Sequence, residues 1–145
     1  MKAILIDPEN HTVTEVEYNG NYKHIYELIG CETFTVVDIG RDNNGLTHSI
    51  FVDDEGLLNN PRYFFIWNGY QQPLAGKGLI LGCDEEGETV AATLDLEAVR
   101  LNVSFTELSV RGFKEIPAHK EMRHGQEFTV IGHQPVFAPP DDDAA

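Results

Sequence analysis

Four aspartates stand where predicted strands end, a common place for carboxylates that hold a metal ion or transfer a proton. They are Asp7, Asp38, Asp53 and Asp54. Aspartate is equally the residue that strand-ending turns require, because its side chain accepts hydrogen bonds from nearby backbone amides. No Gly-x-Ser-x-Gly nucleophile accompanies them in the sequence. We therefore predict no catalytic residue, and a metal-dependent hydrolase is the third of three functional hypotheses.

Three histidines near the C-terminus, His119, His124 and His133, have glutamates nearby that suit a divalent ion. His119 and His124 are five residues apart, whereas two ligands on one helix face are usually four apart. The segment Asp42 to Gly45 begins like a calcium loop but lacks the Glu that closes such a loop. The spacing therefore predicts no metal site, and we expect no cofactor.

Gly76-Lys77-Gly78 has the composition of a phosphate-binding loop, but no Ser or Thr follows the lysine and a predicted strand begins directly after it. The better candidate for a ligand site is the aromatic and amide-rich loop before this lysine, since Trp and Tyr are enriched in ligand pockets and protein contacts. Its candidate ligand-binding residues are Trp67, Tyr70, Gln72 and Lys77. A nucleotide-like anion held there would need cations from Lys77 and Arg62.

Two apolar runs stop in an acidic turn that a glycine closes. Ile50 to Val52 is followed by Asp53-Asp54-Glu55-Gly56, and Leu79 to Gly82 is followed after one residue by Asp84-Glu85-Glu86-Gly87. Short β-rich runs that meet Asp and Gly are typical of strands ending in a reversal. We also predict that the acidic residues of both turns contact a protein partner. These residues are Asp53, Asp54, Glu55, Asp84, Glu85 and Glu86.

The net charge excludes some partners. Ten Lys and Arg against 24 Asp and Glu give a formal charge of −14, which repels nucleic-acid phosphates and anionic lipid surfaces. We therefore expect no direct nucleic-acid contact and no membrane, whereas a protein with a basic surface suits this charge. Cys31 and Cys83 form neither a metal spacing nor a disulfide framework, and the N-terminal apolar stretch is too short for a signal peptide. A cytoplasmic protein is expected.

Short apolar runs between Gly- and Asp-rich turns predict mostly strands, with amphipathic helices at residues 22–29 and 94–101. The predicted fold class is α+β, with a mixed, mainly antiparallel sheet of about six or seven strands and two short helices packed on one face. Residues 1–108 are expected to form this core and residues 109–134 a C-terminal extension packed on it. Residues 135–145, rich in Pro and Asp, are expected to be a disordered tail.

The opening Met1 to Asn10 and the central Gln72 to Gly82 resemble a widespread family of uncharacterised proteins. The likeness includes the turn from Val52 to Gly56 and a Pro-Leu-x-Gly-x-x-Leu-x-Leu-Gly run, and covers roughly residues 1–105. The family is domain-of-unknown-function family 3846, small proteins of phages, plasmids and bacterial mobile elements. The resemblance implies a setting and a fold, and it brings no catalytic residues. Residues 109–145 look like an addition to the family core.

Our leading hypothesis is a non-enzymatic accessory protein of a phage or mobile element that binds a host protein through an acidic surface. A defence or nucleic-acid-handling factor with a basic surface is the expected kind of partner, and such binding would weaken with salt. The alternative is a small module that binds or sequesters a nucleotide-like ligand. A homodimer through sheet edges stays open.

Overall fold

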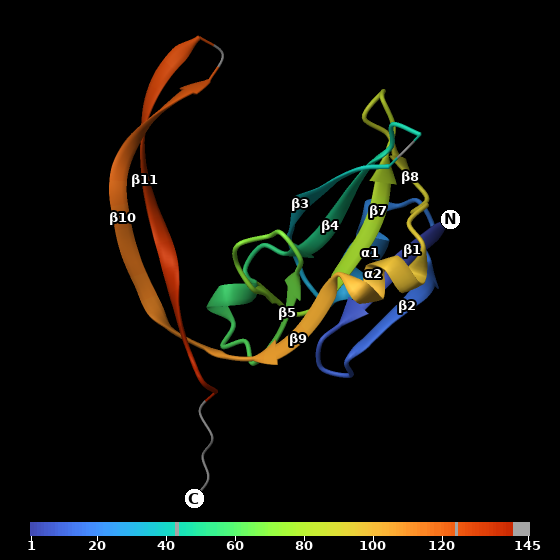
Figure 1. The fold of residues 1–145 in the computed structure, drawn as a ribbon, viewed down its shortest axis with the longest axis horizontal. Helices are drawn as coiled ribbons and strands as arrows, with labels where there is room; N and C mark the ends of the chain where they lie inside the picture. Colours follow the sequence, from blue (N-terminus) through green and yellow to red (C-terminus); the bar gives the residue numbers. More distant parts are fainter. Residues whose placement is uncertain (43, 124, 141–145) are drawn as a thin grey trace, which may run out of the picture.

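The computed structural model describes residues 1–42, 44–123 and 125–140, and its largest unit is a six-stranded sheet. The strand order is β2-β1-β7-β4-β3, with β8 paired to the end of β7 (Figure 1). All strand pairs of the described residues are antiparallel. The strands of this sheet are β1 (Lys2–Asp7), β2 (Thr12–Glu17), β3 (Phe34–Arg41), β4 (Thr47–Asp53), β7 (Gly78–Cys83) and β8 (Thr89–Val90).

A second, three-stranded sheet adjoins the first and has the order β6-β5-β9. The aromatic strand β5 lies between the other two. The strands are β5 (Tyr63–Trp67), β6 (Leu74–Ala75) and β9 (Val103–Glu107). The helices among the described residues are α1 (Tyr22–Ile29), the short 3-10 helix η1 (Gly56–Leu58) and α2 (Leu96–Leu101). The α+β class is therefore confirmed.

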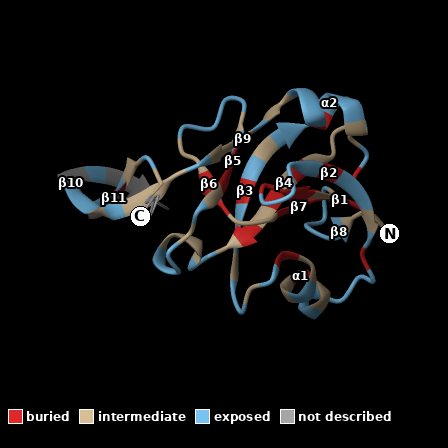
Figure 2. Ribbon diagram, turned by 90° about the horizontal axis from the view of Figure 1, so that it is seen from below, coloured by how far each residue is buried: buried red, intermediate tan, exposed pale blue. Residues whose placement is uncertain are grey.

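The two α-helices lie on opposite faces of the main sheet, so the prediction that both pack on one face is wrong (Figure 2). Ile25 and Ile29 of α1 pack against one face with Leu79 of β7. Val99 of α2 packs against the other face, in the same cluster as Ile80. Alternate side chains of a strand point to opposite faces, and both faces of β7 are apolar and buried. Such a strand needs other elements packed on both of its faces, and α1 and α2 provide them.

Capping residues close in sequence determine both ends of α1 and the start of α2. The side chain of Asn21 accepts a hydrogen bond from the Lys23 amide at 3.1 Å, and Gly30 ends α1 with a φ of 70°. The Asp95 side chain accepts a hydrogen bond from the Ala98 amide at 3.3 Å and so caps α2. The predicted second helix began two residues too early, because Leu94 precedes this cap.

The C-terminal segment is a long two-stranded ribbon of β10 (Ser109–Arg123) and β11 (Gln126–Ala138). Beyond its base it stands off from the rest of the chain in both views (Figures 1 and 2). The tail was expected to begin at Pro135, yet Pro135 pairs with Phe113 inside β11. A two-stranded ribbon tolerates proline because each strand has an open edge. Residues 141–145 lie outside the described residues.

Candidate functional site: an acidic groove

The two predicted acidic turns lie at opposite ends of the main sheet. Neighbouring strands β4 and β7 are antiparallel, with Thr47 opposite Cys83 at one end and Val52 opposite Gly78 at the other. The turn of Asp53 to Glu55 follows β4, whereas the turn of Asp84 to Glu86 follows β7. The structure therefore does not join the predicted protein-binding residues into one surface.

The turn after β7 has the same form as the turn between β3 and β4. Asp84 Oδ1 accepts hydrogen bonds from the amides of Glu86 and Glu88 at 3.0 and 2.9 Å. Asp42 Oδ1 likewise accepts from the amides two and four residues on, at 2.9 and 3.0 Å. Asp84 thus holds the turn, and the exposed carboxylates that remain are Glu85, Glu86 and Glu88, which we call the acidic tip.

At the other end of the sheet, the last turn of α1 and the end of β4 border an open groove of about 550 Å³, which we call the acidic groove. The chain turns sharply at Gly30, and the Asp54 amide donates to the Thr33 carbonyl at 3.2 Å, which brings these segments together. The lining residues are Tyr26, Glu27, Gly30, Cys31, Glu32, Asp53, Glu55 and Asn59. Four of them carry carboxylates, and none is Lys or Arg.

The groove carboxylates are not neutralised within the described part of the chain. The ion pairs there use other acidic residues: Glu15, Glu17, Glu97, Glu107 and Glu127. Asp53 Oδ1 accepts one hydrogen bond, from the Glu55 amide at 2.9 Å. Burial and the negative charge of Asp53 raise the pKa of the Cys31 thiol to about 11, against a smaller lowering by a hydrogen bond to the Thr33 backbone. This thiol stays protonated near neutral pH and is a poor nucleophile.

The predicted ligand-binding residues do not converge on one site. Trp67 packs against the hydrophobic cluster on the α2 side of the sheet. Tyr70 and Gln72 line a hollow of about 130 Å³ together with Asp54. Lys77 lines a different cavity, of about 340 Å³. The aromatic loop is therefore divided between core packing and two separate hollows.

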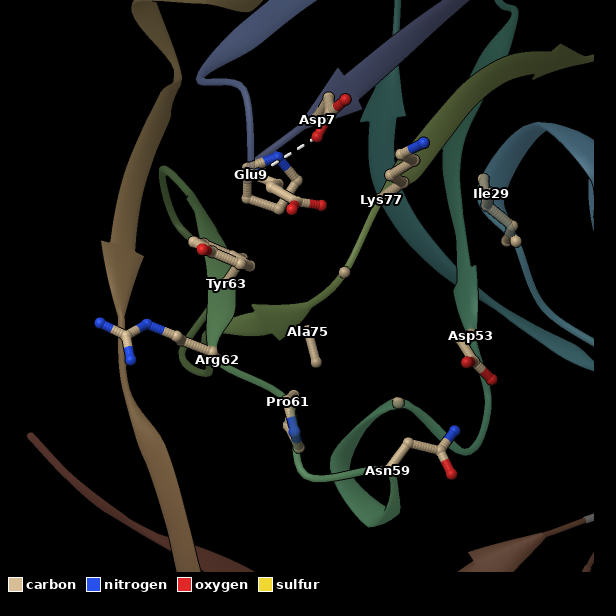
Figure 3. Close-up of a pocket in the computed structure, with 14 residues that line it drawn as sticks. Asp7, Glu9, Ile29, Asp53, Asn59, Pro61, Arg62, Tyr63, Ala75 and Lys77 are labelled. Atoms are coloured by element: carbon tan, nitrogen blue, oxygen red, sulfur yellow. Dashed lines mark hydrogen bonds between the residues drawn. The ribbon is translucent and has the colours of Figure 1, made fainter. Parts of the chain in front are cut away.

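The cavity beside Lys77 lies where three strands end (Figure 3). Ile6 and Val52 both pair with Gly78, so Lys77 stands between the last residues of β1 and β4, Asp7 and Asp53. Asp7 is buried and accepts hydrogen bonds from the amides of Glu9 and Asn10 at 3.1 and 3.3 Å. Two strand-end aspartates thus line the same cavity, but Asp7 holds the adjacent turn.

Three carboxylates line this cavity together with Arg62 and Lys77: Asp7, Glu9 and Asp53. Arg62 Nε also donates to Glu107 Oε1 at 2.8 Å. No ion pair of Lys77 is found among the described residues, although the side chain is half-buried. Lys77 is therefore the cation here that could meet an anionic group of a small molecule.

The described residues contain no group of three His, Cys, Asp or Glu that could hold a metal ion. Asp38 Oδ1 accepts a hydrogen bond from the Gly40 amide at 3.0 Å, as expected of a turn aspartate. His124, one of the three histidines considered as ligands, lies outside the described residues. No helix in the described ranges is long and apolar enough to span a membrane.

The geometry defines a small α+β protein with an acidic groove at one end of its main sheet and a ribbon that projects from its body. Residues 1–103 match the family described as "Domain of unknown function (DUF3846)", and the chain belongs to this family, as the sequence resemblance predicted. The β10–β11 ribbon lies beyond the matched residues.

A similar protein is "Uncharacterized protein y4iR" of Sinorhizobium fredii (strain NBRC 101917 / NGR234). The two sequences are 28% identical over 97 residues, which is 66% of this chain and 57% of the relative. The chain thus spans little more than half the length of that relative. No solved structure matches the chain.

Proposed function

We propose that this protein is a non-enzymatic binding protein whose acidic groove takes up a basic segment of another protein. The observation that carries the proposal is a groove lined by four carboxylates with no Lys or Arg among its lining residues. Carboxylates without an ion-pair partner leave a negative potential, and such a potential attracts Lys and Arg side chains and speeds their encounter.

The proposal extends to the setting of the protein, an accessory protein of a phage or mobile element that acts in the cytoplasm of a host cell. The family resemblance supports this setting. A host protein with a basic surface, such as a defence or nucleic-acid-handling factor, would supply the complementary charge. The acidic groove, with Asp53 and Glu55, would be the point of contact.

Neutralising three groove carboxylates is expected to weaken the binding of a basic peptide about tenfold at low salt, because each exposed charge pair contributes about 0.3 to 1 kcal/mol. The variant is Glu27→Gln, Glu32→Gln and Glu55→Gln together. All three side chains are exposed, so the fold should tolerate the change. The measurement is the fluorescence anisotropy of a labelled oligolysine peptide titrated with wild-type or variant protein.

The acidic tip offers a matched control for this experiment. Glu85→Gln, Glu86→Gln and Glu88→Gln together remove the same number of negative charges from the opposite end of the sheet. This control should keep most of the wild-type affinity, and wild-type binding should weaken as salt is added. An equal loss in both variants would mean that total charge, and not the groove, binds the peptide.

A second candidate function is the binding of a small nucleotide-like molecule in the cavity beside Lys77. The half-buried residue Lys77, which has no ion pair in the described part of the chain, favours it. The cavity volume of about 340 Å³ is at the small end of the range of ligand pockets. The three carboxylates that line the same cavity disfavour a highly charged phosphate chain.

If this candidate is correct, a nucleoside monophosphate at about ten times its Kd should raise the melting temperature by about 3 to 5 °C. Lys77→Ala should abolish that shift, because it removes the cation that meets the phosphate. Lys23→Ala, which removes an exposed lysine of α1, should leave the shift intact. Differential scanning fluorimetry measures all three proteins. A shift that survives in Lys77→Ala, or none with any nucleotide, would rule the candidate out.

A further inference from the structure

The β10–β11 ribbon differs in charge from the rest of the chain. Residues 1–108 contain six Lys and Arg against 18 Asp and Glu, a net charge of −12. Residues 109–138 contain four Lys and Arg against three Glu, a net charge of +1. The basic side chains of the ribbon include Lys114, which is exposed on β10. The ribbon and the body therefore have complementary charges.

The ribbon also has few interactions beyond the pairing of its two strands that could stabilise it. It forms a separate two-stranded sheet, so the outer edge of each strand pairs with no other described strand. Isolated two-stranded ribbons are only marginally stable in water, and open edges favour association. Phe113 and Val136, near its base, are 44% and 40% exposed. A surface that covered this part of the ribbon would stabilise it.

The base of the ribbon adjoins the acidic groove of the same chain. Asn59 lines the groove, and the next residues, Asn60 to Arg62, line a hollow together with Ser109 and Val110 at the start of β10. The ribbon then runs away from its own body (Figures 1 and 2). In a dimer with a two-fold axis near the ribbon base, the ribbon base of each copy would lie beside the acidic groove of the other copy. Such an isologous contact uses the same two surfaces of each copy twice.

We propose that the ribbon of one copy lies across the acidic groove of a second copy, so that Lys114 meets the carboxylates of Glu27, Glu32 and Glu55 in a reciprocal dimer. This proposal rests on the groove's proposed function of binding a basic segment, and it names that segment. The exposed Val136 side chain, on the same face of the ribbon as Lys114, is covered in the same contact.

The oligomeric state of the full chain tests the proposal. Size-exclusion chromatography with light scattering should show a dimer at about 50 mM NaCl and more monomer at about 500 mM NaCl, because salt screens the charge pairs. Lys114→Glu should raise the dimer dissociation constant about tenfold or more, because both copies carry the change. Lys23→Glu, the same charge reversal on the exposed surface of α1, should leave the dimer intact. Combining Lys114→Glu with Glu55→Lys should restore dimerisation.

Cross-linking identifies the contact itself. A zero-length reagent that joins amines to carboxylates, applied to a mixture of isotope-labelled and unlabelled protein, should link Lys114 of one copy to a groove glutamate of the other. A chain that is monomeric at all salt concentrations would overturn the dimer, as would a dimer unaffected by Lys114→Glu and without this cross-link. A monomer that still binds oligolysine through its groove would overturn this inference alone, and the proposed function would stand.

Discussion

Replacing Phe64 by Ala is expected to lower the free energy of unfolding by about 3 to 5 kcal/mol, the cost of removing a large buried ring. Phe64 is fully buried in β5. Its ring also meets Phe137 of β11 edge to face, with the centroids 5.6 Å apart and an interplanar angle of 88°. The substitution should therefore weaken the body and release the base of the ribbon together. Urea unfolding followed by circular dichroism measures the first effect.

Phe137→Ala is the matched variant, since it removes the other ring of the same pair from the half-buried side. We expect it to cost about 0.5 to 1.5 kcal/mol for the ring contact and to leave the unfolding midpoint of the body nearly unchanged. Trypsin should then cleave the ribbon at Lys114 and Lys120 faster than in the wild type, while the body resists. Equal destabilisation by the two variants would show that the ribbon and the body unfold as one unit.

Much of the fold follows from signals that act over a few residues. Asn21 and Gly30 cap α1 through contacts with residues two to four positions away, so the sequence alone predicts the bounds of that helix. The face that each helix covers depends instead on what packs on both sides of β7, including residues 50 or more positions away. That the run Leu79 to Leu81 is apolar at every position was the available signal for two covered faces.

The separation of the two acidic turns follows from strand direction. Both apolar runs end in an acidic turn when read along the chain, and antiparallel neighbours have their chain ends at opposite ends of the sheet. Once β4 and β7 pair as antiparallel strands, Asp53 and Asp84 must lie far apart. The pattern of apolar, acidic and glycine residues predicts each turn correctly, but it does not predict which strands become neighbours.

Only two of the four carboxylates of the acidic groove could be predicted from the sequence, because the other two join it through tertiary packing. Asp53 and Glu55 belong to a turn that the sequence marks clearly. Glu27 and Glu32 were missed, because each is an isolated exposed glutamate near the end of a short helix, with no distinctive spacing. They join the groove only because α1 packs on the sheet with its last turn beside the end of β4. That contact depends on the tertiary packing of Ile25 and Ile29.

A buried histidine should make the stability of this protein depend on pH. His48 of β4 is 1% exposed, and its Nε2 accepts a hydrogen bond from the Thr93 amide at 3.1 Å. The Thr93 hydroxyl donates to Asp42 Oδ2 at 2.7 Å, which ties the segment before α2 to the β3–β4 turn. Burial lowers the pKa of His48, and the nearby Asp42 carboxylate and the Leu46 backbone offset only part of this effect.

The unfolded chain therefore binds a proton at His48 more readily than the folded chain does. Stability from this group is complete above the ordinary histidine pKa of 6.5 and is lost as the pH falls below 6.5 towards the folded-state pKa. The hydrogen bond from Thr93 is the main cause that lowers the pKa of Asp42 below 3.8. The stability that this carboxylate contributes is therefore lost only at a more acidic pH than the stability from His48. The two groups act in separate pH ranges.

His48→Ala is expected to cost about 2 to 4 kcal/mol near neutral pH, because it opens a cavity and leaves the Thr93 amide without its acceptor. The variant should also lose the decline in stability below the ordinary histidine pKa of 6.5, so its difference from the wild type should shrink as the pH falls. Urea unfolding at a series of pH values measures both effects, and His133→Ala, at an exposed position of β11, should keep the wild-type slope. If the stability of His48→Ala fell with pH as steeply as that of the wild type, another titrating group would have to cause the decline. The role of His48 would then be limited to packing and to its hydrogen bond with Thr93.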